Sequence, residues 1–489
     1  MQHLRMWLLI QASNVALTDA PMRWSMRALL PRSMQGSRWS IGAARGHRAR
    51  AGLLVLLSLL FQGCALQQWQ STGVGRYLDS HSLTETLAKL ESQSPNDRDL
   101  PMHLLNRGLV HHLLGNYQRS NQDLEAAKIA LEKVQALSLT EGLTSSTINE
   151  TFTVYSATPS ERVLLHTLMA LNYLALQDLS SARVEALQSD LRIRELADEN
   201  ADLASARFIS GIIFELNTEW SDAMISYRKA EQILTRRKLP IPDLLQQRLL
   251  QISQQLGQES EYQQYRTRFP RALMTLPENY GEVMLLYLKG KVPSKQQQMI
   301  SLYVPSLAHH VTIAQPYYPP KTGYPLVTSQ PLGTEQVKLQ LLEDVDELAR
   351  EALQAGQAKR IALSLARVTA KHQLVKNSRK KDPILGLLSD LTAILTETAD
   401  IRSWNLLPAV IQIGVIQLPA GSYIDLGDLD AKAVAVKGAD VTPVDLNSVD
   451  LNKKASGSPP RSRRLEVKAG ATQLLIANSY RPLGTLVLH

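Results

Sequence analysis

Small and bulky residues recur at fixed intervals between residues 80 and 265, a stretch rich in Leu, Ala, Gln and Glu. In the segment that starts near Ala204, small residues stand at positions 8, 20 and 27 and bulky ones at positions 11, 17 and 24. They are Gly211, Ala223, Ala230, Phe214, Trp220 and Tyr227. The apolar spacing is helical. Small residues let two paired helices approach closely, and bulky residues fill the space between pairs. The pattern therefore predicts stacked helical hairpins.

Two upstream segments carry the same pattern. The first starts near Pro101 and the second near Val163; their matching residues are Gly108, Gly115, Tyr117, Leu124, Ala127, Ala170, Tyr173 and Ala182. These positions resemble the tetratricopeptide repeat, a 34-residue helical hairpin, although the usual proline at position 32 is missing from all three segments. The resemblance implies a concave surface that binds a protein or peptide. Asn172, Arg183 and Glu185 are its candidate lining residues, and a purely supporting scaffold is the alternative.

From residue 280 onward the pattern changes to short strands separated by Gly and Pro. We expect strands at 282–288, 299–304, 310–315, 324–328, 410–418, 431–437, 463–468 and 472–477, and helices at about 339–355, 359–377 and 383–398. Residues 447–464 read as a flexible loop. The fold class is therefore α+β multidomain: an all-α repeat array at 80–265, then a mixed domain at 280–489 with mainly antiparallel strands and a helical insertion.

The amino-terminal 63 residues have the features of a leader. A basic stretch precedes eleven uncharged residues, 51–61, which are too few to cross a bilayer as a helix. The run ends at Phe61-Gln62-Gly63-Cys64, which resembles the bacterial lipoprotein signal. The resemblance implies a diacylglycerol on the Cys64 thiol and cleavage before Cys64. Since 63 residues are long for a signal peptide, we expect translation to start at Met34. A genuine amino-terminal extension at residues 1–33 is the alternative.

Ala65 follows the cysteine, where an Asp would resemble an inner-membrane retention signal. The outer membrane, on its periplasmic side, is therefore the expected location. Residues 64–79 are expected to form a tether. A core cysteine in a soluble cytoplasmic adaptor is the alternative reading of Cys64, and it requires the leader to be spurious.

The net charge of +8 comes mostly from the leader, which holds eight arginines, no lysine and one acid. The remaining chain is nearly neutral, so a nucleic-acid partner is not supported. One basic run, Lys371–Lys381, suits lipid headgroups or acidic glycan, or forms a solvated helix end. Cys64 is the only cysteine, which excludes disulfides within the chain and zinc sites built from several thiolates.

The sequence nominates no catalytic residue, metal or cofactor. The pairs His111-His112 and His309-His310 are adjacent, and neighbouring side chains diverge in both helices and strands. The motifs of zinc proteases, serine hydrolases, P-loop enzymes and dinucleotide-binding proteins are all missing from the sequence. We therefore expect the protein not to be an enzyme.

One polar segment stands out in the carboxy-terminal half. Glu397, Asp400, Arg402 and Trp404 lie in the sequence TETADIRSWNLLP. We expect Asp400 and Arg402 to form an ion pair with Trp404 packed beneath it, as a structural corner. A ligand or partner site is the alternative.

This segment, the Cys64 signal, YRKA in the third repeat and GEVMLLYLKGKVPSK at 281–295 together resemble a family of uncharacterised Gram-negative lipoproteins. These have a helical-repeat front and a β-rich back. The resemblance covers most of residues 51–430 and implies no activity. The leading hypothesis is an outer-membrane-anchored periplasmic lipoprotein that acts as a protein-binding scaffold or regulator of an envelope process. A periplasmic enzyme or glycan-binding module, with its site in the carboxy-terminal domain, is the alternative.

Overall fold

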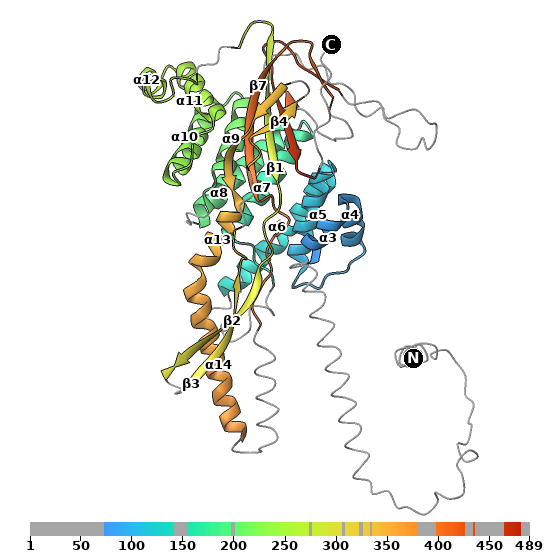
Figure 1. Cartoon of the computed structure of the whole chain (residues 1–489), viewed down its shortest axis with the longest axis vertical. Coiled ribbons are helices and arrows are strands. Elements are labelled where there is room, and N and C mark those ends of the chain that lie inside the picture. The colour runs from blue at the N-terminus through green and yellow to red at the C-terminus, as the bar shows by residue number, and fades with distance from the viewer. Residues whose placement is uncertain are drawn as a thin grey trace, which may run out of the picture. The chain divides into compact units, whose positions relative to one another are not determined.

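A computed structural model describes residues 73–140, 154–196, 201–272, 276–305, 309–321, 326–332, 335–379, 398–425, 434–435 and 464–480. The leader, Cys64 and Glu397 lie outside these residues, as do the expected helix at 383–398 and the expected loop at 447–464 except for the last residue of each. The fold is a helical-repeat array followed by a carboxy-terminal region of mainly antiparallel sheets (Figure 1).

The array contains four hairpins preceded by two shorter helices. In chain order the helices are α3 (Val74–Ser80), α4 (Leu83–Glu91), α5 (Leu100–Leu113), α6 (Tyr117–Thr140), α7 (Pro159–Ala175), α8 (Leu179–Leu196), α9 (Ala204–Leu216), α10 (Trp220–Arg236), α11 (Asp243–Gln255) and α12 (Glu259–Arg268). The pairs α5/α6, α7/α8 and α9/α10 are the three predicted hairpins. The pair α11/α12 is a fourth hairpin that the repeat pattern did not indicate.

Each hairpin turns in the same way. One residue adopts a positive φ: Gly115, Gln177, Thr218 and Gly257 in turn. The next backbone N–H then donates to the carbonyl five residues earlier, as from Asn116 to His111 at 2.9 Å. This geometry closes the carboxyl end of a helix. It recurs without glycine in two hairpins, α7/α8 and α9/α10.

The main sheet has the strand order β6-β7-β1-β11-β9. Strand β1 (Tyr280–Lys289) pairs antiparallel with β7 (Val410–Pro419) and parallel with β11 (Thr472–Asn478). The remaining strands are β2 (Gln296–Val304), β3 (His309–Tyr317), β4 (Ser329–Leu332), β5 (Glu335–Lys338), β6 (Gln340–Asp344), β8 (Tyr423–Asp425), β9 (Val434–Ala435) and β10 (Arg464–Glu466). Helices α13 (Val345–Ala355) and α14 (Gln357–Arg379) stand between β6 and β7.

Alternate residues of β1 face opposite sides of the sheet. Met284, Leu286 and Leu288 belong to the same hydrophobic core as the repeat helices. Val283 and Leu285 belong to a smaller core covered by the β4–β5 hairpin. The predicted repeat array and α+β region are therefore joined by a packed interface.

Three element predictions were wrong. Residues 340–344 form β6 rather than the start of a helix, because the short apolar run at Leu341–Leu342 suits either element and its pairing with β7 decides it. The helix begins only at Val345, where the Asp344 side chain accepts a hydrogen bond from the Glu347 backbone N–H. Residues 326–328 are not a strand, and residues 74–79 of the expected tether belong to α3.

Candidate protein-binding surface

The first helices of the hairpins are almost wholly buried. In α9, twelve of thirteen residues are buried, and in α7, fourteen of seventeen. The second helix α8 has only five buried residues of eighteen. First helices line the concave side of arrays of this kind. Because the first helices are buried on nearly all sides, the concave side of the array is already covered by other parts of the chain.

The carboxy-terminal region covers the first helices. Asp99 at the start of α5 lies 3.1 Å from Arg402, and Glu161 of α7 accepts a 2.7 Å hydrogen bond from the Trp404 backbone N–H. Farther along, α9 and α11 contact the main sheet. The chain's own strands and loops thus occupy the surface that the repeat resemblance assigns to a partner.

A buried ionic network joins α11 to the sheet. Arg248 is 4% exposed, and its guanidinium contacts the carboxylates of Glu282 on β1 and Glu215 on α9. The Tyr227 hydroxyl donates to Glu215 at 2.9 Å. Although burial opposes its charge, the two carboxylates raise the pKa of Arg248. Burial and the neighbouring Glu215 raise the pKa of Tyr227 well above its usual value.

A second buried carboxylate joins α9 to β6. Glu343 is 1% exposed and accepts hydrogen bonds from the Ser205 backbone N–H at 3.0 Å and from the Ser205 hydroxyl at 3.3 Å. Burial raises the pKa of Glu343 to about 7, although these hydrogen bonds act in the opposite direction. The group therefore titrates near neutral pH.

The expected corner contains the Asp400–Arg402 ion pair, at 2.7 Å. The Arg402 side chain is fully buried and also pairs with Asp99, while Trp404 is 1% exposed. Both carboxylates raise the pKa of Arg402 against the effect of burial. Because its charges pair with one another, the corner fits a structural role. It ties the front of α5 to the segment before β7.

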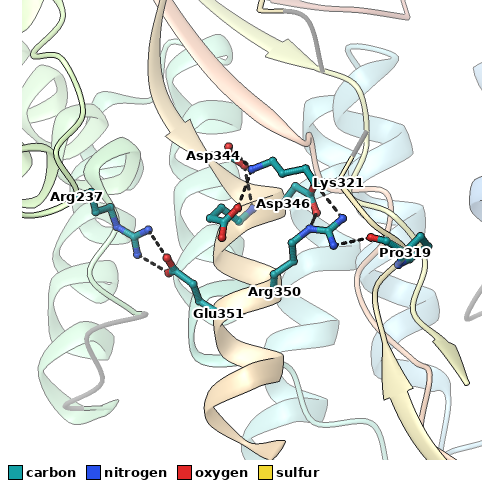
Figure 2. Close-up of polar contacts among 8 residues, drawn as sticks. Arg237, Pro319, Lys321, Asp344, Asp346, Arg350 and Glu351 are labelled. Atoms are coloured by element: carbon teal, nitrogen blue, oxygen red, sulfur yellow. Dashed lines mark hydrogen bonds and ion pairs between the residues drawn. The ribbon is translucent and has the colours of Figure 1, made fainter. Parts of the chain in front are cut away.

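Helix α13 is held from two sides (Figure 2). Arg237, one residue after α10, contacts both carboxylate oxygens of Glu351 at 3.0 and 3.3 Å. On the other side Arg350, which pairs with Asp346 of the same helix at 2.9 Å, donates to the Pro319 carbonyl at 2.6 Å. These contacts fix α13 between the array and the segment that follows β3.

The repeat positions pack as the small and bulky pattern requires. Five of the repeat residues are fully buried: Ala127, Ala182, Ala223, Tyr227 and Ala230. Tyr117 is also buried, and Tyr173 and Trp220 are partly buried against the same core. A Cβ added to Gly108 would lie 2.9 Å from Leu124, and one added to Gly211 would lie 2.5 Å from Tyr227. Glycine therefore permits the close approach inside two hairpins, whereas Gly115 supplies the positive φ of a turn.

The expected groove residues do not form an open groove. Asn172 is fully buried and bonds to His112, Ser120 and Asn121 of the first hairpin. Glu185 is buried and bonds to His166 at 2.7 Å. Only Arg183 is partly exposed, and it pairs with Glu219. The prediction was wrong for Asn172 and Glu185 because they satisfy buried polar groups between helices.

The second helices carry an exposed apolar surface instead. Five aliphatic side chains on α6, α8 and α10 are 41–51% exposed: Ile129, Val184, Leu187, Leu191 and Ile225. Ion pairs hold the three helices side by side, with Arg192 of α8 3.1 Å from Glu132 of α6, and Lys229 of α10 3.2 Å from Asp190 of α8. We call these five residues the outer stripe.

The outer stripe was missed in the sequence because Val184, Leu187 and Leu191 fit a core-facing helix pattern equally well. Their spacing, i, i+3 and i+7, puts them on one face. Burial of Ala182, Ala186 and Ile193 shows that another face of α8 is the inner one.

Within the described residues, no group of three or more His, Cys, Asp or Glu side chains is placed to hold a metal ion. A search of the same residues finds no helix with the length and apolarity needed to cross a membrane.

No protein-family model matches the chain. No curated protein matches it. Solved structures of helical-repeat proteins resemble its amino-terminal region. They include apo RapI, with a TM-score of 0.30 and 12% identity over 39% of this chain and 48% of RapI. MamA from AMB-1 has a TM-score of 0.28 and 14% identity over 43% of this chain and 95% of MamA.

PlcR from Bacillus thuringiensis, in complex with the peptide PapR7 and DNA, has a TM-score of 0.26 and 13% identity. That match covers 43% of this chain and 66% of PlcR. The chain spans about half the length of RapI. Likenesses this weak carry no argument about function.

Proposed function

We propose that this chain is a protein-binding scaffold or regulator whose outer stripe binds a partner, and that it is not an enzyme. The outer stripe carries the proposal: three exposed aliphatic side chains share one face of α8, and the adjoining helices α6 and α10 each add one. Several exposed apolar side chains on adjoining helices mark an interaction site. The chain's own sheet covers the usual concave surface, so the outer stripe is the apolar repeat surface left for a partner.

The chemistry of the stripe suits an amphipathic helix. Val184, Leu187 and Leu191 present a seam at i, i+3 and i+7, against which a partner helix packs its own apolar face. Paired charges border the seam on both sides. They favour a helix with an apolar face and polar flanks over an extended strand.

We further propose that Cys64 carries a lipid and holds the protein on the periplasmic side of the outer membrane. The leader pattern and its single cysteine support this. The mass of the detergent-extracted amino-terminal peptide tests it beside Cys64→Ala. Acyl chains on Cys64 are expected in the wild type. An unmodified chain that retains residues before Cys64 refutes the anchor and restores the cytoplasmic adaptor.

Site-specific photo-crosslinking in intact cells tests the stripe. A photo-reactive amino acid replaces Leu187, and in a control it replaces Leu326, which is as exposed but lies outside the stripe. We expect a discrete crosslinked protein from position 187 alone, and its loss with Leu191→Glu. Equal products at both positions, or none at 187, refute the proposal.

A further inference from the structure

The β2–β3 hairpin and helix α14 together form a projecting part of the chain, which we call the arm. Both parts extend away from the main sheet in Figure 1. They are joined by Gln315 of β3, whose side-chain amide donates to the Ser364 hydroxyl of α14 at 3.2 Å. Near its root, Lys321 contacts Asp344 at 2.7 Å and Glu347 at 2.8 Å, at the start of α13.

The arm concentrates positive charge. Helix α14 carries six basic residues and no acidic one: Lys359, Arg360, Arg367, Lys371, Lys376 and Arg379. Two of them are engaged within the chain, since Arg367 is buried and donates to the Ser364 hydroxyl at 3.0 Å, and Arg360 donates to the Leu353 carbonyl. The hairpin carries no Lys, Arg, Asp or Glu. The rest of residues 64–489 contains 39 basic and 44 acidic residues. A net negative remainder thus carries a strongly positive arm.

The hairpin adds exposed apolar groups. Met299 is 53% exposed and Tyr303 57% exposed. Both are on β2, on the face that alternation also gives to Ser301. The Tyr303 ring meets the His310 ring edge-on, with centroids 5.4 Å apart. Tyrosine and other amphipathic side chains favour the membrane–water interface, and basic residues favour anionic headgroups.

The tip of the arm and the Cys64 anchor can extend a similar distance from the root of the arm. Helix α3 begins at the arm root, since a Cβ added to Gly75 would lie 3.6 Å from Lys291 and 3.7 Å from Ser294, in the β1–β2 connection. Nine steps of chain separate Cys64 from Gly73, which span at most about 30 Å when extended. Helix α14, with 23 residues, is about 35 Å long.

We propose that the arm is a second membrane contact, whose tip docks on the anionic lipid surface of the membrane that holds Cys64. This inference rests on the lipid anchor of the proposed function. The anchor limits the distance of the chain from the membrane, and the arm fixes the orientation of the chain relative to the membrane. Together they hold the chain at two points, so that the outer stripe is presented at a fixed height.

Single-cysteine labelling tests the arm on the full chain. Cys64→Ala removes the only cysteine, and Ser301→Cys then carries an environment-sensitive fluorophore on the arm. Ser221→Cys on α10 is the matched control, because it is also an exposed serine. The probes are vesicles of phosphatidylcholine alone and vesicles with 30% phosphatidylglycerol. The apolar leader is present in both labelled proteins, so the difference between labels reports the arm.

We expect a blue shift and increased intensity at position 301 with anionic vesicles only, reversed by 0.5 M salt. Each cation near an anionic surface contributes about fivefold to binding. Lys371→Gln with Lys376→Gln is therefore expected to lower vesicle affinity about 25-fold. Helix content from circular dichroism should not change.

Three results would overturn the inference: no shift at 301, the same shift at 221, or the same shift on uncharged vesicles. A shift with a soluble acidic polymer but not with vesicles also overturns it and identifies an acidic macromolecule as the partner. The vesicle assay lacks the anchor, whereas the peptide mass reports the anchor alone. Failure of one proposal is thus distinguishable from failure of the other.

Discussion

Replacing Arg248 with methionine tests whether the sheet and the repeat helices stabilise each other. Arg248 is the cation between two buried carboxylates, Glu215 at 7% and Glu282 at 3% exposure. Methionine fills much of the same volume but leaves both carboxylates without their cation. Breaking a buried ion pair in this way costs about 3–5 kcal/mol. Whole domains are stable by only about 5–15 kcal/mol.

The assay is urea unfolding of the full chain, followed by tryptophan fluorescence. Arg248→Met is expected to lower the apparent free energy of unfolding by about 3–5 kcal/mol at pH 7. Arg266→Met on the exposed side of α12 is the control, with an expected change within about 0.5 kcal/mol. Adding Glu282→Gln to Arg248→Met removes one uncompensated charge, so the double variant should be more stable than Arg248→Met.

Two results would refute the reasoning. One is a loss below about 1 kcal/mol for Arg248→Met at pH 7, and the other is a deficit that Glu282→Gln does not reduce.

Three further predictions concern the same interfaces. The pKa of Glu343 is raised to about 7 from an ordinary value of 4.5. Its carboxyl group therefore contributes fully to the free energy of unfolding below pH 4.5, and this contribution is lost as pH rises through 7. In urea unfolding, the difference in free energy of unfolding between wild type and Glu343→Gln should change by about 3 kcal/mol across that window. Gly211→Ala should lower stability by about 1–2 kcal/mol in thermal unfolding despite its better helix propensity, because the new Cβ meets Tyr227 at 2.5 Å, and an unchanged melting temperature would contradict this. Arg402→Met should cost about 3 kcal/mol by removing the fully buried cation that Asp99 and Asp400 share, although Asp99 keeps its ion pair with Arg98; normal stability combined with lost partner binding would instead make the corner a binding site.

Local patterns predicted much of the fold. The small residues Gly108 and Gly211 and the alanines of α8 and α10 marked the hairpins, because helix pairing within a hairpin depends on residues close in sequence. Strands β1, β7 and β11 were also predicted, since long apolar runs indicate buried strands. Strand β6 was not, because its five residues form a strand only by pairing with β7, about 70 residues away.

The sequence by itself determined the first three hairpins, the Asp400–Arg402 pairing and the concentration of basic residues on α14, because each depends on neighbours within a few turns of chain. Only the tertiary structure decided which repeat surface stays open. Asn172 and Leu187 both suit a helix face, and nothing local distinguishes them. Packing of α7 against the first hairpin buries Asn172, where it bonds to His112, Ser120 and Asn121, whereas Leu187 on α8 stays exposed.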